Sequence, residues 1–162
     1  MKVNEIRIRK ATEKDTPIIC SLIKEIAEYE KLSYEVTATE EKIRETLFGS
    51  KSYAEVIIAE YENKPVGQAL FFHNYSTFLA QPGIYLEDLF VRPKFRGKGI
   101  GKALLKSLVK IAEERNCARV EWVVLNWNKP AIDFYKNLGA VPMDEWTTYR
   151  LTSDKYENLL ND

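Results

Sequence analysis

Hydrophobic and polar residues follow regular patterns over most of the first fifty positions. Residues 5–10, EIRIRK, alternate between apolar and charged side chains, which predicts a strand. The apolar residues that follow recur at i, i+3 and i+4 up to about Lys31, which predicts an amphipathic helix with Asp15 as its N-cap and Pro17 in its first turn. A second, shorter helix is predicted over residues 39–48.

The middle of the chain reads as strands followed by a helix. Residues 53–76 contain two apolar runs separated by ENKP, which predicts a β-hairpin. Residues 83–91, GIYLEDLFV, are a third strand candidate. From Gly99 to about Arg115 the apolar residues have helical spacing, so a long amphipathic helix is expected directly after a glycine-rich turn.

The last forty residues predict two more strands around a short helix. Residues 119–127, RVEWVVLNW, are strand-like, residues 128–140 read as a helix that Gly139 ends, and residues 146–151 alternate again. The resulting order β–α–α–β–β–β–α–β–α–β predicts an α+β or mixed α/β sheet rather than a doubly wound one. Because no linker or repeat interrupts the chain, we expect a single domain over residues 1–162.

Composition narrows the class of protein. The 162 residues are 45% hydrophobic, and 24 Lys and Arg balance 24 Asp and Glu, so no basic excess points to a nucleic-acid partner. No apolar run approaches the roughly 18 residues of a membrane span, and the N-terminus has no secretory signal, so we expect a cytoplasmic protein without a membrane partner. Cys20 and Cys117 are expected to be free thiols, and no metal site is expected.

The glycine-rich turn RGKGIG, residues 96–101, carries the first chemical signal. It lies between a predicted strand and a predicted helix, where free backbone N–H groups and the helix dipole favour an anion. Glycines allow a ligand to approach the backbone closely. Arg96, Lys98 and Lys102 add positive charge, so a ligand with more than one phosphate is expected.

Two familiar phosphate-binding patterns do not match this turn. The P-loop pattern fails because Arg96 occupies its first glycine position and Ala103 its final Ser or Thr position. The dinucleotide pattern G-x-G-x-x-G, read from Gly97, ends on Lys102. The spacing that remains is R-x-x-G-x-G over residues 96–101. Taken alone, this short motif leaves open an ordinary glycine-rich loop with surface lysines.

R-x-x-G-x-G between a strand and a helix resembles the acetyl-CoA pyrophosphate loop of the GNAT N-acetyltransferase family. A second segment, NWNKPAIDFYKNLGA at 126–140, resembles the family's later N-x-x-A-x-x-[FY]-Y-x-x-x-G-[FA] element. The residues at the matching positions are Asn128, Ala131, Phe134, Tyr135, Gly139 and Ala140. The resemblance covers essentially the whole chain and is closest to the branch of diamine (spermidine/spermine-like) and thialysine acetyltransferases.

The resemblance implies a central, mostly antiparallel twisted sheet of about six or seven strands, splayed at the cofactor site and flanked by about four helices. It implies acetyl-CoA as cosubstrate and, as is common in the family, a homodimer. The residues it assigns to the cofactor are Leu89, Phe90, Val91, Arg96, Gly97, Lys98, Gly99, Ile100, Gly101, Lys102, Asn128, Ala131, Phe134 and Tyr135.

The resemblance also implies two catalytic residues. Glu87 lies nine residues before Arg96, where the diamine branch has a carboxylate that takes the proton of the amine through ordered water. Tyr135 is the implied general acid for the departing thiolate, and a backbone N–H near Phe90 is expected to polarise the thioester carbonyl. Because strand side chains alternate, Asp88 is expected on the opposite face from Glu87 and away from the site.

The acceptor implied by the resemblance is a primary amine of a small molecule. Glu30 occupies the place of an acceptor-binding carboxylate, together with Glu87, Ser76 and Tyr149. Ser76 stands where spermidine/spermine enzymes have Asp, and Tyr149 where they have Trp, so a short diamine or a lysine-like amine is at least as consistent as a long polyamine. Acetylation of a protein amine and a non-catalytic acyl-CoA sensor are the alternatives.

Overall fold

The computed structural model describes residues 5–161 of the chain. It divides into two compact units, Met1–Val123 and Val124–Asp162, which we describe separately. Within residues 5–161, no helix is long and apolar enough to cross a lipid bilayer. The expectation of a single domain stays a prediction.

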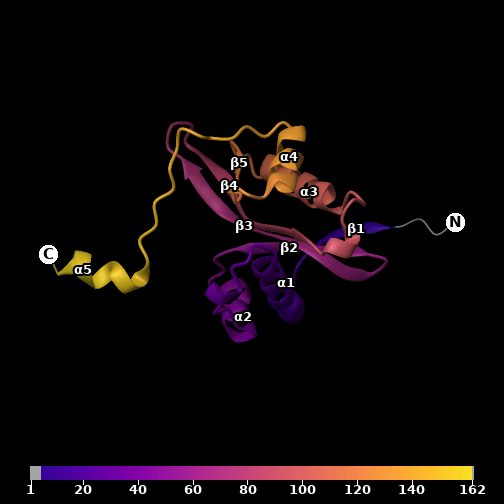
Figure 1. Cartoon of the computed structure of the whole chain (residues 1–162), viewed down its shortest axis with the longest axis horizontal. Coiled ribbons are helices and arrows are strands. Elements are labelled where there is room, and N and C mark those ends of the chain that lie inside the picture. The colour runs from indigo at the N-terminus through magenta and orange to yellow at the C-terminus, as the bar shows by residue number, and fades with distance from the viewer. Residues whose placement is uncertain (1–4, 162) are drawn as a thin grey trace. The chain divides into compact units, whose positions relative to one another are not determined.

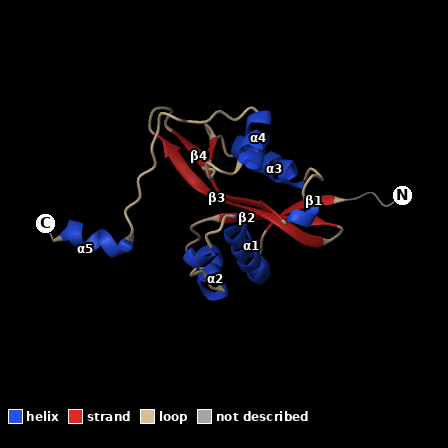
Figure 2. Ribbon diagram, in the orientation of Figure 1, coloured by secondary structure: helices blue, strands red, loops and turns tan. Residues whose placement is uncertain are grey.

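The first unit is built on one five-stranded sheet (Figure 2). Its strands lie in the order β1-β2-β3-β4-β5, and all neighbours are antiparallel except β4 and β5, which are parallel. The mixed, mostly antiparallel sheet expected from the sequence is therefore confirmed. The strands are β1 Ile6–Lys10, β2 Glu55–Tyr61, β3 Lys64–Ser76, β4 Gln81–Val91 and β5 Val120–Glu121.

Three helices cover the two faces of this sheet (Figure 1). Helices α1 (Thr16–Tyr29) and α2 (Glu40–Phe48) lie on one face, and α3 (Ile100–Glu114) lies on the other. The apolar period of α1 explains its placement, because Ile19 and Leu22 are fully buried on the side that faces the sheet. Short 3-10 turns precede or follow the helices at Glu13–Asp15, Ser33–Glu35 and Pro93–Phe95.

The hairpin between β2 and β3 forms where the sequence predicted it. Its turn residues Glu62 and Asn63 both have positive φ, 50° and 63°, which is the backbone pattern of a type I′ turn and matches the right-handed twist of paired strands. The hairpin is the centre of the sheet, since β1 pairs with β2 on one side and β4 with β3 on the other.

The second unit contains helix α4 (Lys129–Asn137), a 3-10 turn (Ser153–Lys155) and helix α5 (Tyr156–Leu160). Gly139 ends α4 as predicted. Its φ of 88° lies in the left-handed region, and the Ala140 N–H reaches back to the Tyr135 carbonyl at 3.1 Å, as in a Schellman motif.

Two strand predictions near the C-terminus are wrong. The strand expected over 119–127 is reduced to Val120–Glu121, and residues 146–151 form no strand. Alternation indicates a strand only where a neighbouring backbone can pair with it. Trp146 and Tyr149, at 77% and 93% exposure, pack on no sheet, so the described chain has five strands instead of six or seven.

A buried network of charges joins the start of α1 to the sheet. Arg9 in β1 donates to both carboxylate oxygens of Asp15 at 2.8 Å and to Glu60 of β2 at 2.7 Å. The Thr12 N–H donates to Asp15 at 2.7 Å. Hydrogen bonds from Arg9 favour the ionised carboxylate and lower the pKa of Asp15 to about 2.

We expect Asp15→Asn to lower the free energy of unfolding by about 2 kcal/mol at pH 7, since a pKa held below its unfolded value makes the ionised carboxylate stabilising. That stabilisation is complete above the unfolded pKa of Asp and disappears as the pH falls towards about 2. Urea unfolding of parent and variant between pH 7 and pH 3 measures the difference, with Glu41→Gln, an exposed carboxylate on α2, as the control. A difference that does not shrink as the pH falls contradicts this role.

Candidate active site

The C-terminal half of β4 has a strand partner on one side only. Strand β5 pairs with β4 at Ile84 and Tyr85 and then ends, whereas β3 continues along β4 to Val91. Beyond Tyr85, no strand among residues 5–161 pairs with the edge of β4 that faces away from β3. Leu89, Phe90 and Val91, the backbone expected to contact the cofactor, lie in this part of the strand.

A β-bulge falls inside the same half of β4. Leu70 pairs with Asp88, but the next residue of β3, Phe71, pairs with Leu86, so Glu87 is the extra residue. Glu87 is exposed, while Leu86 is buried. Because a bulge breaks strict alternation, Asp88 is not constrained to the face opposite Glu87.

Cross-strand pairs show which face Asp88 occupies. Side chains of directly paired residues lie on the same face of a sheet. Val56 pairs with Leu70, and Leu70 pairs with Asp88. Because Val56 belongs to the core under α1 and α2, all three side chains lie on the α1 face. At the C-terminal end of α1, Glu30 lies close enough to interact electrostatically with Asp88. Asp88 therefore lies on the α1 face near Glu30, a position that strict alternation along β4 does not predict.

We call Glu30, Glu87 and Asp88 the acidic cluster. Partial burial, followed by repulsion from Glu87 and Glu30, raises the pKa of Asp88 to about 6. Burial alone raises the pKa of Glu30. Among residues 5–161, no group of three or more His, Cys, Asp or Glu is arranged so that it could hold a metal ion.

The glycine-rich loop adopts the backbone that its glycines permit. Gly97 and Gly99 have φ of 75° and 83°, values that favour glycine because other residues are strained there. The 3-10 turn Pro93–Phe95 precedes them, and α3 begins at Ile100 with Gly99 as its N-cap. Gly99 has no side chain to accept from the first N–H groups of the helix, and such N–H groups favour an anion.

Arg96 fastens the loop to its surroundings. Its Nε donates to the Val91 carbonyl at 2.9 Å, and its guanidinium lies 4.4 Å from the centre of the Tyr29 ring and 5.5 Å from that of Phe90. Lys98 lies over Tyr61, with Nζ 5.3 Å from the ring centre. Direct contact of these cations with phosphate stays a prediction.

A second cation anchors the start of the loop. Arg92 donates to both oxygens of Glu25 on α1, at 2.7 and 2.9 Å, and to the Pro65 carbonyl at 3.2 Å. The Ser21 hydroxyl donates to the same carboxylate, and hydrogen bonds from Arg92 lower the pKa of Glu25. Residues 25 and 92 are 67 positions apart, so no local pattern in the sequence reveals this pair.

Gly67 lets β3 and β4 approach closely beside the site. It pairs with Val91, and a Cβ added at Gly67 would lie 2.6 Å from the Phe90 carbonyl oxygen. Since Cβ atoms do not approach a carbonyl so closely, this position excludes larger residues unless β4 shifts.

Ser76 lies apart from the acidic cluster. It pairs with Gln81 at the far end of the β3–β4 hairpin, six residues along β4 from Glu87, or roughly 20 Å at the rise of a strand. Its buried hydroxyl accepts from the Leu79 N–H at 3.4 Å. Contact with an acceptor thus stays a prediction for Ser76.

The second unit holds the other predicted residues on or near α4. Asn128 is buried and caps the helix, with its side-chain oxygen accepting from the Ala131 N–H at 3.3 Å. Phe134 and Tyr135 lie next to each other, with ring centres 5.4 Å apart. Tyr149 lies outside α4, exposed in the irregular segment that follows it.

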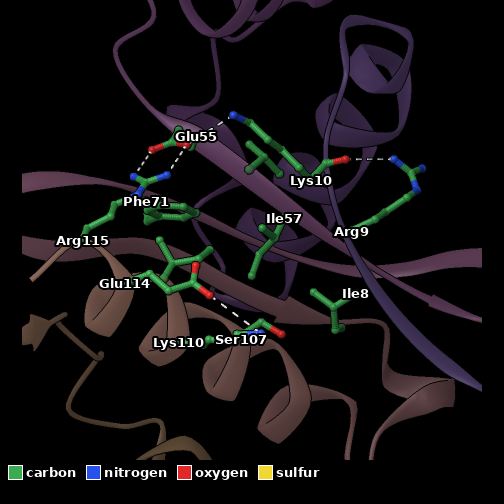
Figure 3. A pocket seen from close by; sticks show the side chains of 12 residues that line it. Ile8, Arg9, Lys10, Glu55, Ile57, Phe71, Ser107, Lys110, Glu114 and Arg115 are labelled. Atoms are coloured by element: carbon green, nitrogen blue, oxygen red, sulfur yellow. Dashed lines mark hydrogen bonds and ion pairs between the residues drawn. The ribbon is translucent and has the colours of Figure 1, made fainter.

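A separate cavity of about 350 Å³ lies on the α3 face of the sheet (Figure 3). Phe71 and Ile57 form part of its lining, and Arg115 donates to both oxygens of Glu55 at 2.5 and 2.9 Å. None of the residues predicted for the active site lines this cavity.

The lone histidine and the two cysteines belong to the framework. The two ring nitrogens of His73 contact the Gly83 carbonyl and the Arg115 guanidinium, each at 3.0 Å. Nδ1 therefore donates to Gly83, and Nε2 accepts from Arg115. Cys20 is buried and Cys117 partly buried, and both are free thiols, as the sequence predicted.

Known proteins resemble this chain over nearly its full length. Thialysine N-epsilon-acetyltransferase of Bos taurus is 38% identical, covering 95% of this chain and 96% of its own. L-ornithine N5-acetyltransferase NATA1 of Arabidopsis thaliana is 34% identical, covering 94% and 87%. The solved structure of an integron cassette protein from V. cholerae has a TM-score of 0.81 at 27% identity, covering 97% of this chain and 98% of that one.

The model of the Acetyltransferase (GNAT) family matches residues 19–140, which include the loop before α3 and the whole of α4. Members of this family use acetyl-CoA. With more than half of the chain matched, and with relatives above 30% identity at nearly full coverage, the chain belongs to the GNAT family and is an acetyltransferase.

Proposed function

We propose that this enzyme transfers the acetyl group of acetyl-CoA to a primary amine of a small molecule by direct attack of the amine. The observation that carries the proposal is the acidic cluster beside the loop before α3. Carboxylates attract a cationic acceptor, and two of the three, Glu30 after α1 and Asp88 in β4, are partly withdrawn from solvent. The names of the relatives, which specify thialysine and ornithine, support the same class of acceptor.

The residues of the chain fit acetyl-CoA. The uncapped start of α3 and the two positive-φ glycines before it suit a pyrophosphate, and the unpaired edge of β4 suits the amide groups of pantetheine. Leu89 to Val91 and Arg96 to Lys102 would hold the cofactor, together with Asn128, Ala131, Phe134 and Tyr135 of the second unit. When bound, acetyl-CoA supplies the activated thioester carbonyl.

Glu87 takes a proton from the attacking nitrogen, directly or through water. An alkylamine with a pKa near 10.4 is almost entirely protonated at neutral pH, so a base is needed before the nitrogen can attack. The backbone N–H near Phe90 polarises the carbonyl. Tyr135 donates its proton to the departing thiolate, so no covalent intermediate with the protein is required.

The acceptor is a short diamine or the side-chain amine of a lysine-like amino acid. Glu30 holds the cationic end of the acceptor, with Ser76 and Tyr149 as the further contacts proposed on the resemblance. Thialysine and ornithine both carry an amine on a short side chain, and both are named in relatives that match 94–95% of this chain.

The protein is further proposed to act as a cytoplasmic homodimer. Support comes from residues 146–151, whose large apolar side chains Trp146, Tyr149 and Leu151 are exposed and pack on no sheet of the described residues. A second copy of this chain would provide a strand partner for this segment.

Sedimentation equilibrium is expected to give twice the mass of the chain, and a monomer at micromolar concentration contradicts the dimer.

Thiol release from acetyl-CoA is expected with amines such as thialysine, lysine, ornithine, putrescine and spermidine. Glu87→Gln and Tyr135→Phe should each lower kcat by roughly 10²-fold, since each removes a proton-transfer group. Glu45→Gln, an exposed carboxylate on α2, is the control and should behave like the parent. If acetyl-CoA raises the melting temperature but no amine or peptide releases thiol, the chain is an acyl-CoA sensor. Release with peptides alone favours a protein acceptor.

Arg96→Ala and Gly99→Val should weaken binding of coenzyme A by about tenfold or more while the circular dichroism spectrum is retained. The first change frees the loop from β4, and the second places a β-branched residue at a positive φ. Titration calorimetry measures the affinity, with Lys94→Ala as the control because this exposed cation lies in the same segment. Unchanged affinity in both variants removes the pyrophosphate assignment.

A further inference from the structure

Acetylation removes two protons from the acceptor nitrogen. An alkylammonium, RNH₃⁺, becomes an amide, R–NH–CO–CH₃, so one proton must leave before the attack and a second as the N–C bond forms. One of the two protons accounts for the thiol product, and the other is released to solvent. The proposed function names Glu87 as an acceptor, which leaves one of the two transfers without a named group.

Asp88 has the position for that second role. It lies next to Glu87 in β4, and the bulge brings it to the α1 face, where Glu30 stands at the end of the helix. Glu87 and Glu30 are the charged groups that act on it, and its neighbours in β3 on that face, Leu70 and Gln68, are uncharged.

Gln68 is an independent sign that this face is built around polar groups. It pairs with Phe90 and therefore shares the face of Asp88, one step along the sheet. Its side chain is fully buried, and neither amide atom has a hydrogen-bond partner among the described residues. Such a group destabilises a core by about 1–3 kcal/mol, so its presence in an otherwise apolar row is not explained by packing.

We propose that Asp88 is a second proton acceptor of the active site, which converts the bound ammonium of the acceptor to a neutral amine and leaves Glu87 to take the proton released as the N–C bond forms. An N–H bond breaks and an O–H bond forms on Asp88. The nitrogen lone pair then attacks the carbonyl carbon as the C–S bond breaks, and Tyr135 protonates the sulfur. Asp88 afterwards returns its proton to solvent, and the proton taken by Glu87 replaces, through solvent, the one that Tyr135 gave to the sulfur. This inference rests on the proposed function.

The burial and repulsion that act on Asp88 favour this order of events. A carboxyl group with a pKa of about 6 is a stronger base than an unperturbed one, yet it is still ionised at neutral pH. An arriving ammonium is attracted by Glu30, Glu87 and Asp88 together, and transfer of its proton to Asp88 relieves the repulsion among them.

The pH dependence of kcat/KM for the amine tests the proposal. In the parent, the enzyme uses the ammonium form, so kcat/KM should be nearly flat from pH 7 to 9 and fall below about pH 6, where Asp88 becomes protonated. In Asp88→Asn the neutral amine must come from solution, so kcat/KM should rise about tenfold per pH unit. The loss should be roughly 10³- to 10⁴-fold at pH 7 and only about tenfold near pH 9.5.

Matched variants separate this role from a structural one. Glu87→Gln should lower the rate by a similar factor at every pH, and Glu45→Gln should leave the profile of the parent unchanged. Asp88→Glu keeps a carboxyl group, so its kcat/KM should stay nearly constant from pH 7 to 9, and the pH below which kcat/KM falls should shift. If Asp88→Asn fails to fold, as judged by melting and coenzyme A binding, the profile of Asp88→Glu decides, and a sloping profile overturns the proposal.

Three outcomes are distinguishable. A profile of Asp88→Asn that parallels the parent at all pH values, whether at full or reduced rate, overturns the proton-acceptor role and leaves the proposed function intact. A slope in the parent itself overturns the role in the same way. Absence of thiol release by the parent with every amine defeats the proposed function, and this inference with it.

Discussion

The bulge at Glu87 is the constraint on which the arrangement of the site depends. One extra residue in β4 shifts the register against β3, so that Leu86 and Asp88 pair with the adjacent residues Phe71 and Leu70. If Glu87 took a regular place in the ladder instead, the side chains that follow would change faces. With the bulge, Asp88 and Phe90 lie under α1, and the edge of β4 beyond Tyr85 has no partner strand among residues 5–161. The bulge thus gives this segment its acidic face, and the early end of β5 gives it an open edge.

Two arginines connect that segment to the helix above it. Arg92 joins the end of β4 to Glu25 in the middle of α1, and Arg96 joins the loop to Tyr29 near the end of α1. Both side chains are thereby used in holding the loop against the sheet. The features of the loop that suit an anion are the backbone conformations of its glycines and the first N–H groups of α3. The charges of the two arginines, in contrast, hold the loop in place.

The parts of this structure that the sequence could predict are those set by local chemistry. The period of α1, the turn of the β2–β3 hairpin and the glycine ends of α3 and α4 each follow from residues within one element. The strands predicted over residues 119–127 and 146–151 were wrong, because a strand needs a neighbouring strand to pair with and alternation does not specify one. The face on which Asp88 lies could not be predicted for a related reason. A bulge depends on the packing of two strands, and no residue pattern within either strand indicates it.

Gly67 shows that the geometry of the site also depends on residues far in sequence from the glycine-rich loop. It lies 29 positions before Arg96, outside residues 96–101 and 126–140, yet the Phe90 carbonyl occupies the space that a side chain there would need. A map of mutational sensitivity for this protein would therefore follow the register of the sheet as well as the glycine-rich loop. In a laboratory selection for new acceptors, position 67 would act as a fixed point, because variation there moves the strand that carries the chemistry instead of reshaping the pocket around it.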